Sequence, residues 1–290
     1  MVKHKLNRDQ ILIAGCGDIG SQLGLNLVAQ GHSVVGLRRN ISQLPQGIQG
    51  ITADLSQPDT LSALPQAIDS VFYIVSAGRR DETVYQQAYP QGLQNLLNAL
   101  HQQAIQPRQL FFISSTAVYH QQHDEWVDEN SVTEPDNFSG RIMLAAEKIA
   151  LDSDIPATVV RFSGIYGPGR NYMLGQVNRG IGYPSTPPRY SNRVHRDDCV
   201  GALAYLYHLS QQQPLLTCYL VSDDTPAPLD EVSDWLAQQL GVEITERSAR
   251  RTIGSKRCRN TRIKQSGYQF KYPDYQAGYP ELIKTFKRQR

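Results

Sequence analysis

The segment ILIAGCGDIG, residues 11–20, constrains the fold of this chain more than any other stretch. It places Gly15, Gly17 and Gly20 in Gly-x-Gly-x-x-Gly spacing, directly after a β-branched run and before a segment of helical length. In such a turn the first glycine permits the tight bend, the second lets the backbone approach a pyrophosphate, and the third lets helix pack on strand. The helix N-terminus, with Asp18 and Ile19, supplies backbone N–H donors for the anion. The spacing therefore predicts a dinucleotide-binding turn; a turn without chemical consequence is the alternative.

Short apolar runs alternate with helix-length segments between residues 11 and 162. The runs are β-branched or aromatic and lack polar alternation, which is typical of strands buried on both faces. They are residues 11–15, 33–37, 71–76, 110–115 and 157–162. The helix-length segments are residues 18–30, 83–103 and 139–152. This order predicts an α/β fold, a Rossmann-like doubly wound parallel sheet, followed by a small C-terminal α-rich lobe.

The domain boundaries follow from a change in composition. Residues 1–169 are expected to form the Rossmann dinucleotide-binding core, completed by residues 192–222, which contain a further helix and strand. Residues 170–191 are part of a stretch rich in Gly and Pro with little periodicity. Together with residues 223–290 they are expected to form a small substrate-binding lobe.

Composition excludes several other classes of protein. The net charge of the 290 residues is only +2, and no Lys/Arg stripe interleaves with aromatic residues, so nucleic acid is not an expected partner. No apolar run approaches the length of a membrane span, and MVKHKLNRDQ lacks the apolar stretch of a signal peptide, so we expect a cytoplasmic protein. The four cysteines are far apart and are interpreted as free thiols. We expect no metal site, because the polar loop at residues 120–125 has no supporting ligand cluster.

The end of the second strand carries the signal for cofactor preference. A protein that prefers NAD usually has an acidic residue there, which bonds the ribose 2′-hydroxyl. Here Arg38 and Arg39 stand at that position. Two guanidinium groups suit a 2′-phosphate, so NADP is favoured over NAD; a solvated basic turn is the alternative.

Four further residues are expected to line the cofactor site. Asp54 and Leu55, in TADLSQPDTL after the third strand, are placed to meet the adenine amino group and ring. Ser76 ends the run at 71–76 and Ala77 follows it, at the carboxyl end of a strand, where parallel sheets bind ligands. Cys16, inside the glycine turn, is interpreted as a small packing residue.

These residues resemble the extended short-chain dehydrogenase/reductase superfamily, specifically its NAD-dependent epimerase/dehydratase branch. After the glycine turn the landmarks are ADL, FFISSTAVYH, RFSGIYGPGRN, NRVHRDDCVGAL, VSDDTPAPLDEVSDWLAQQLG and GSKRCRNTRI, which together cover nearly the whole chain. The resemblance is greatest to an atypical bacterial subgroup. It implies an NAD(P)-binding Rossmann fold and a small-molecule substrate such as a nucleotide sugar.

The resemblance also shows what this chain lacks. Working members use a Ser or Thr near the end of strand five, a Tyr, and a Lys four residues after the Tyr. Ser115 falls on the first position, but Ser139 stands at the Tyr position and Met143 at the Lys position, with Glu147 on a usual Glu. An aliphatic hydroxyl is a far weaker acid than a phenol, and Met carries no charge. Ordinary Tyr-driven proton transfer is therefore not expected.

Two tyrosines are the candidate substitutes for the missing phenol. Tyr119 and Tyr166 both follow strand ends on the carboxyl side of the sheet, although in relatives the corresponding aromatics mostly shape the pocket. Lys148 is five residues past Met143, which rotates it onto a different helix face. Arg141 stays charged and cannot act as a base. The catalytic candidates are therefore Ser115, Tyr119 and Tyr166.

The substrate candidates come from two later landmarks. Arg193 matches an arginine that reaches substrate phosphate in relatives, and Asn171 is a donor at the pocket edge. His195 either contacts substrate or is a hydrogen-bonded structural histidine. Two functions stay open: an NADP-dependent epimerase, dehydratase or reductase with an unusual acid/base group, and a catalytically silent NADP-binding sensor. Relatives often pair through two helices per subunit, so a homodimer is a further expectation.

Overall fold

The computed structural model describes residues 8–248 and 255–288. The first residue of the GSKRCRNTRI landmark, most of MVKHKLNRDQ and the last two residues lie outside this range. A seven-stranded sheet dominates the fold, in the order β12-β7-β5-β4-β1-β2-β3. Its strands are β1 (Gln10–Ala14), β2 (Ser33–Arg38), β3 (Gln49–Thr52), β4 (Ser70–Tyr73), β5 (Gln109–Ser115), β7 (Ala157–Phe162) and β12 (Cys218–Val221).

The central strands of the sheet run parallel to one another. β1 pairs in parallel with β2 on one side and with β4 on the other, and β3 and β5 continue the sheet in the same direction. The chain builds β1, β2 and β3 outward and then returns to place β4 beside β1. Such a reversal is the topological switch point at which doubly wound sheets bind ligands. The predicted fold class is confirmed.

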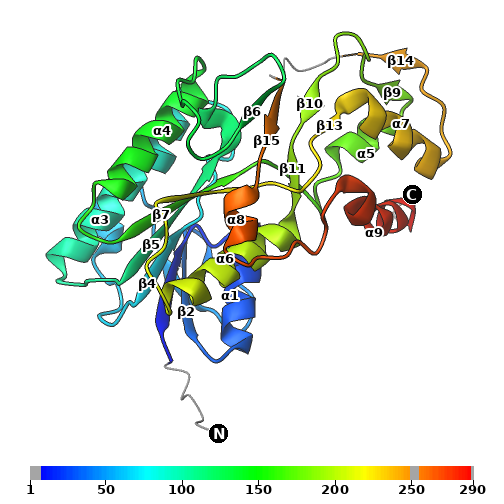
Figure 1. The fold of residues 1–290 in the computed structure, drawn as a ribbon. Helices are drawn as coiled ribbons and strands as arrows, with labels where there is room; N and C mark the ends of the chain where they lie inside the picture. Colours follow the sequence, from blue (N-terminus) through cyan, green and yellow to red (C-terminus); the bar gives the residue numbers. More distant parts are fainter. Residues whose placement is uncertain (1–7, 249–254, 289–290) are drawn as a thin grey trace, which may run out of the picture. The chain divides into compact units, whose positions relative to one another are not determined.

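Helices cover both faces of this sheet, with α1 and α6 on one side and α3 and α4 on the other (Figure 1). The helices are α1 (Asp18–Ala29), α2 (Glu82–Gln86), α3 (Gly92–Gln102), α4 (Phe138–Leu151), α5 (Tyr172–Val177), α6 (Arg196–Ser210), α7 (Leu229–Leu240), α8 (Thr261–Gln265) and α9 (Tyr275–Arg288). No helix within the described ranges has the length and apolar character that a membrane span requires.

Short strands and 3-10 turns complete the fold. The strands, which pair two by two outside the main sheet, are β6 (Glu125–Val127), β8 (Gly164–Tyr166), β9 (Ile181–Gly182), β10 (Tyr190–Ser191), β11 (Arg193–His195), β13 (Ala227–Pro228), β14 (Glu246–Arg247) and β15 (Lys256–Cys258). The 3-10 turns are η1 (Ile41–Gln43), η2 (Pro58–Leu61) and η4 (Thr116–Val118).

The single helix predicted at residues 83–103 is wrong in one respect. The structure divides it into α2, a π-helical segment η3 (Gln87–Gln91) and α3. Pro90 lies inside the π-helical segment. Because proline has no backbone N–H and its ring crowds the preceding turn, the regular α-helical hydrogen-bond pattern cannot pass through it, and the wider π turn accommodates the ring.

The run predicted as a strand at 71–76 is also shorter than expected. β4 ends at Tyr73, and Ile74 still donates its backbone N–H to the carbonyl oxygen of Ala14 at 2.8 Å. Ser76 and Ala77 have left the sheet and belong to the loop at the switch point.

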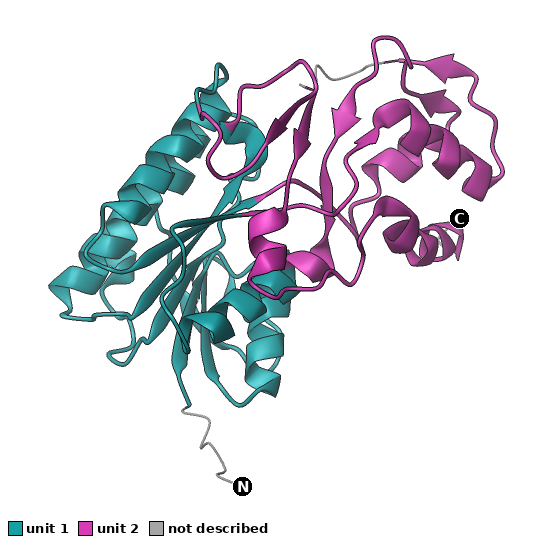
Figure 2. Ribbon diagram, viewed as in Figure 1, with its two compact units in different colours: residues 1–118, 134–161, 200–219 teal, residues 119–133, 162–199, 220–290 magenta. Residues whose placement is uncertain are grey.

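The chain divides into two compact units (Figure 2). Unit 1 comprises residues 1–118, 134–161 and 200–219, and unit 2 comprises residues 119–133, 162–199 and 220–290. Unit 1 contains the glycine turn and helices α1, α3 and α4. Unit 2 contains a separate apolar cluster formed by α5, α7 and α9, with Tyr166, Tyr275 and Tyr279 among its buried members.

Candidate functional site

The glycine turn lies at the switch point between β1 and β4. Gly15 has a positive φ of 84°, and its N–H and that of Cys16 both point to the carbonyl oxygen of Leu37, at 3.1 and 3.3 Å. A Cβ on Gly15 would lie 2.4 Å from the carbonyl oxygen of Ile74. Glycine is therefore required at position 15 both for its backbone conformation and for the close approach of the neighbouring strand's loop.

The next two glycines have different surroundings. Gly17 is exposed and is the N-cap of α1, with no side-chain cap, and a Cβ there would meet only the carbonyl oxygen of Gly15 at 4.0 Å. Gly20 is buried, and its Cβ would lie 3.0 Å from the side chain of Ile13. Gly17 thus leaves open space at a helix N-terminus, with Asp18 exposed beside it and Ile19 packed inward, while Gly20 lets α1 contact β1. This cradle fits a pyrophosphate.

Arg38 is held beside that turn. Its Nη1 donates to the carbonyl oxygen of Cys16 at 3.2 Å, and its Nη2 donates to Oε1 of Gln43 at 2.5 Å. Arg39, the next residue, is exposed. A guanidinium has five N–H donors, so these two hydrogen bonds orient the Arg38 group and leave others for a ligand.

The remaining predicted cofactor residues lie in two loops of unit 1. Asp54 follows β3, and its Oδ1 accepts from the backbone N–H and the hydroxyl of Ser56, at 2.9 and 2.8 Å. The Leu55 carbonyl accepts from the side chain of Asn95 at 2.8 Å. The Asp54 carboxylate therefore shapes its own loop, whatever else it contacts.

Ser76 and Cys16 differ in their access to solvent. Ser76 is exposed, and its hydroxyl accepts weakly from the N–H of Gly78 at 3.4 Å. Cys16 is fully buried, and burial raises the pKa of its thiol. A buried, protonated thiol is a packing group and a poor nucleophile.

The residues at the usual Tyr and Lys positions lie on the first two turns of α4. Ser139 is half-buried, and its hydroxyl donates to Oδ1 of Asn137, the N-cap residue, at 2.6 Å. Met143 is buried, with 6% of its surface exposed. Ser115, at the end of β5, is partly exposed, and its hydroxyl accepts from the N–H of Ala117 at 3.2 Å. The first two turns of α4 thus offer a helix-capping hydroxyl and a thioether at the positions where the family resemblance predicts a phenol and an ammonium group.

Glu147, on the third turn of α4, belongs to a buried ion pair. Its two carboxylate oxygens accept from Nε and Nη2 of Arg161 on β7, at 3.0 and 2.6 Å, and Oε1 also accepts from the Ser114 hydroxyl at 2.5 Å. Arg161 was not among the residues singled out from the sequence. The sequence signal that could have identified it is its place inside the apolar run ATVVRF, because an arginine buried in a strand requires a buried partner of opposite charge.

The charged residues near Met143 do not replace the lost lysine. Lys148 is exposed and pairs with Asp152 at 2.6 Å, as its predicted rotation to another face implies. Arg141 is exposed and donates to the carbonyl oxygen of Asp136.

The two candidate phenols are buried in unit 2 and donate to backbone carbonyls. The Tyr119 hydroxyl donates to Asp128 O at 2.8 Å, and the Tyr166 hydroxyl donates to Asp274 O at 3.3 Å. Burial, together with the nearby Asp223, raises the pKa of Tyr166. Both hydroxyls are therefore engaged by backbone carbonyls.

His195 is a buried neutral histidine. Its Nδ1 accepts from the backbone N–H of Asp197 at 3.1 Å, and the ring of Tyr272 packs against it with centroids 4.0 Å apart. Burial lowers the pKa of His195 to about 4, although the Asp197 carboxylate opposes this effect. These contacts fit the structural alternative better than the substrate-binding one.

The depressed pKa of His195 predicts a loss of stability in acid. A histidine with an unfolded pKa near 6.5 and a folded pKa of about 4 contributes its full stability above the unfolded value and loses it as the pH falls toward the folded one. Between about pH 7.5 and about pH 5 this loss is expected to reach roughly 2 kcal/mol. Urea unfolding at both pH values should show that His195→Gln, which does not titrate, removes this part of the acid sensitivity. An unchanged pH dependence in the variant would contradict the assignment.

The other two predicted substrate-binding residues, Arg193 and Asn171, differ in burial. Arg193, the first residue of β11, is 5% exposed, and its Nη2 donates to the Ser191 hydroxyl at 2.5 Å. Asn171 is half-buried at the start of α5 and makes no side-chain capping hydrogen bond there. Unit 2 thus brings Tyr166, Arg193 and His195 onto the paired strands β8 and β11, while Asn171 lies on a different element.

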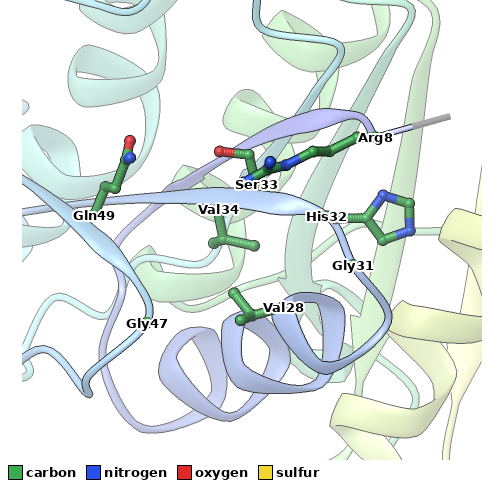
Figure 3. A pocket seen from close by; sticks show the side chains of 8 residues that line it. All are labelled: Arg8, Val28, Gly31, His32, Ser33, Val34, Gly47 and Gln49. Atoms are coloured by element: carbon green, nitrogen blue, oxygen red, sulfur yellow. The ribbon is translucent and has the colours of Figure 1, made fainter.

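A pocket of about 340 Å³ lies elsewhere in unit 1. Figure 3 shows Val28 at the end of α1 and His32, Ser33 and Val34 at the start of β2 among the residues that line it. These are the amino ends of the strands, whereas ligands of doubly wound sheets bind at the carboxyl ends. This pocket is therefore not the candidate cofactor site.

Comparison with known proteins agrees with this geometry. Residues 11–186 match the model of the NAD dependent epimerase/dehydratase family. A solved structure of a protein from Methylobacillus flagellatus, assigned to the NAD-dependent epimerases/dehydratases, is 37% identical with a TM-score of 0.84, covering 97% of this chain and 99% of that one. MoeE5 in complex with UDP-glucose and NAD is 23% identical with a TM-score of 0.78, covering 97% and 99%. At that identity the likeness to MoeE5 is one of fold alone.

A curated relative has a named reaction. The 3-diazoavenalumate denitrifying reductase of a Streptomyces species is 28% identical over 255 residues, which are 80% of this chain and 82% of the reductase.

Proposed function

This chain belongs to the NAD-dependent epimerase/dehydratase family, and we propose that it is an NADP-dependent reductase. One observation carries the proposal: unit 1 keeps the glycine turn with Arg38 beside it, while α4 has a capping hydroxyl at Ser139 and a buried thioether at Met143. The cofactor machinery is retained and the acid/base pair is lost.

The lost pair argues against sugar epimerisation or dehydration. Those reactions begin with removal of a hydroxyl proton, for which the Tyr phenol and its Lys partner serve in relatives. Reduction of an electrophile requires a hydride, which NADPH supplies when bound, and a proton that solvent can deliver. Ser115 remains as a hydrogen-bond donor that could orient a substrate oxygen. The reductase name of the 28% identical relative supports the same choice.

Arg38 supports the preference for NADP. Its guanidinium is oriented at the end of β2 by two hydrogen bonds, and neither of its acceptors is a carboxylate that would compete for the 2′-phosphate or repel it. The 2′-hydroxyl of NAD would find no acidic partner at Arg38 or Arg39.

The test is a titration followed by a turnover assay. Calorimetry with NADPH and NADH should show tighter binding of NADPH, and the NADPH-loaded protein should consume the reduced nicotinamide with activated carbonyl, diazo or conjugated substrates. Turnover of UDP-glucose with an oxidised cofactor would instead establish a nucleotide-sugar enzyme. Tight NADPH binding without any turnover would favour the silent sensor, and no binding of either cofactor would refute the proposal.

Arg38→Ala is expected to reduce NADPH affinity by about 30-fold, because a charge-assisted hydrogen bond contributes about 2 kcal/mol. NADH affinity should change by less than about threefold, since NADH lacks the phosphate. Arg39, the exposed neighbour, provides the matched control: Arg39→Ala should reduce NADPH affinity less than Arg38→Ala does. Equal losses for both cofactors would show that Arg38 only supports the turn through the Cys16 carbonyl.

A further inference from the structure

Unit 2 contains a buried pair of opposite charges that do not bond to each other. Arg193 is 5% exposed and Asp223, just after β12, is 1% exposed. The Asp223 N–H donates to the Arg193 carbonyl at 2.7 Å, so the two backbones are adjacent. Yet Nη1 of Arg193 has no hydrogen-bond partner, and neither carboxylate oxygen of Asp223 accepts from a side chain within the described residues.

Such an arrangement calls for a third group. Buried polar atoms are nearly always paired with protein, water or ligand, and a charged group left alone is the costliest exception. Arg193 and Asp223 interact electrostatically without forming an ion pair. The free Nη1 therefore presents a donor that nothing in the described part of unit 2 occupies.

Three tyrosines lie near the Arg193 side chain. The Arg193 guanidinium lies over the Tyr275 ring, 5.6 Å from its centroid. Tyr166 stacks on Tyr279 with centroids 4.8 Å apart, and all three tyrosines belong to the same buried cluster. A ligand held by Arg193 would meet flat, largely apolar walls.

The charge balance restricts what that ligand can be. Among the described residues Arg193 is the cation that acts on Asp223, whereas Asp224 and Asp274 add negative charge around it. Burial raises the pKa of Asp223 well above its ordinary value, and Arg193 and the Thr225 backbone N–H oppose this only in part. A single arginine beside a carboxyl group whose pKa is raised can neutralise one negative charge but not a diphosphate.

We propose that the side chains of Arg193 and Asp223 together bind the carboxylate of a planar aromatic monocarboxylic acid, with the tyrosine rings of unit 2 against its body. This inference names the substrate class of the proposed reductase and so rests on that function. Arg193 donates from Nη1 to one carboxylate oxygen, and the Asp223 O–H donates to the other. A nucleotide diphosphate does not fit this charge balance.

The experiment is calorimetric titration of the full chain, with and without NADPH, using benzoate, cinnamate, cinnamamide and UDP. The two carboxylates are expected to bind, and cinnamamide and UDP to bind at least about tenfold more weakly. Arg193→Gln should weaken carboxylate binding by about 30-fold. The matched control is Arg179→Gln, an exposed arginine of the same unit, which should leave it unchanged.

Asp223→Asn separates a binding role from a purely structural one. Asparagine can still donate but cannot ionise, so affinity should stay within about threefold. Binding to the wild type should weaken as the pH rises and Asp223 ionises, and this pH dependence should be absent in the variant. The titratable and charged groups that act on this region are Arg193, Asp198, Asp224, Asp274, Tyr166, Tyr183, Tyr279, Lys256 and Cys258. Because all of these groups stay in place in Asp223→Asn, a pH dependence that disappears in this variant is assigned to Asp223.

Three results would overturn the inference. UDP binding that depends on Arg193 would make the residue a phosphate ligand. NADPH binding without binding of either carboxylate would refute the substrate class and leave the proposed reductase standing. Retained carboxylate affinity in a folded Arg193→Gln protein, checked by thermal unfolding, would show that the arginine has only a structural role. Failure of NADPH to bind would count against the reductase itself.

Discussion

Replacing Gly17 with alanine is expected to lower the affinity for NADPH by about 100-fold, a loss near 3 kcal/mol, without unfolding the protein. The φ of Gly17 is −86°, which alanine adopts readily, and among the described residues the nearest atom to a Cβ there, outside its chain neighbours and its own helix backbone, is the Gly15 carbonyl oxygen at 4.0 Å. The added methyl group would instead occupy the space into which a pyrophosphate must come at the start of α1. Fluorescence or calorimetric titration measures the loss, and thermal unfolding checks the fold.

Two comparisons make the Gly17 result specific. Gly175→Ala, on α5 in the other unit, adds a methyl group whose nearest neighbour is the Arg179 side chain at 3.7 Å, and it should leave NADPH affinity unchanged. Gly15→Ala should destabilise the whole protein, because its Cβ would overlap the Ile74 carbonyl. If Gly17→Ala binds NADPH as tightly as the wild type does, the cofactor does not use this turn.

The second large effect is expected at the buried ion pair beneath α4. Arg161→Leu should reduce the free energy of unfolding by about 3–5 kcal/mol, because it leaves the Glu147 carboxylate in the interior without its counter-ion. Both side chains are at most 8% exposed, and two hydrogen bonds join them. Urea unfolding monitored by circular dichroism measures the change.

A double variant and an exposed pair provide the controls. Glu147→Met combined with Arg161→Leu removes both charges and should recover much of the stability lost in the single variant. Lys148→Ala breaks the exposed pair with Asp152 on the same helix and should cost less than about 1 kcal/mol. A loss below about 1 kcal/mol for Arg161→Leu would mean that water or another group compensates Glu147.

Local patterns in the sequence were sufficient for the fold class and the glycine turn. The strand-like runs and their spacing predicted the parallel sheet, and Gly15, Gly17 and Gly20 lie where that prediction requires. The prediction was wrong at residues 83–103, where hydrophobic periodicity continues through Pro90 but the helical hydrogen-bond pattern does not. Periodicity reports which face is buried; it does not report how each backbone group is satisfied.

The candidate site was predicted less completely. The physical reason is that its contacts join residues that are far apart in the sequence. Sequence spacing predicted that Ser139 and Met143 stand at the positions of the acid/base pair, since both lie on one helix at fixed separation. It could not show that the Tyr166 hydroxyl donates to the carbonyl of Asp274, 108 positions away.

By itself, then, the sequence determined the parallel sheet and the glycine turn, and it predicted the cofactor role of Arg38 and the loss of the phenol and ammonium groups, because each depends on residues within one strand, turn or helix. Only the tertiary structure decided that Arg161 neutralises Glu147, that His195 is a neutral buried base, and that the side chains of Arg193 and Asp223 lie close together without a hydrogen bond between them. Burial, desolvation and pairing depend on neighbours that are distant in the chain, and these decide which groups stay charged and which still lack a partner.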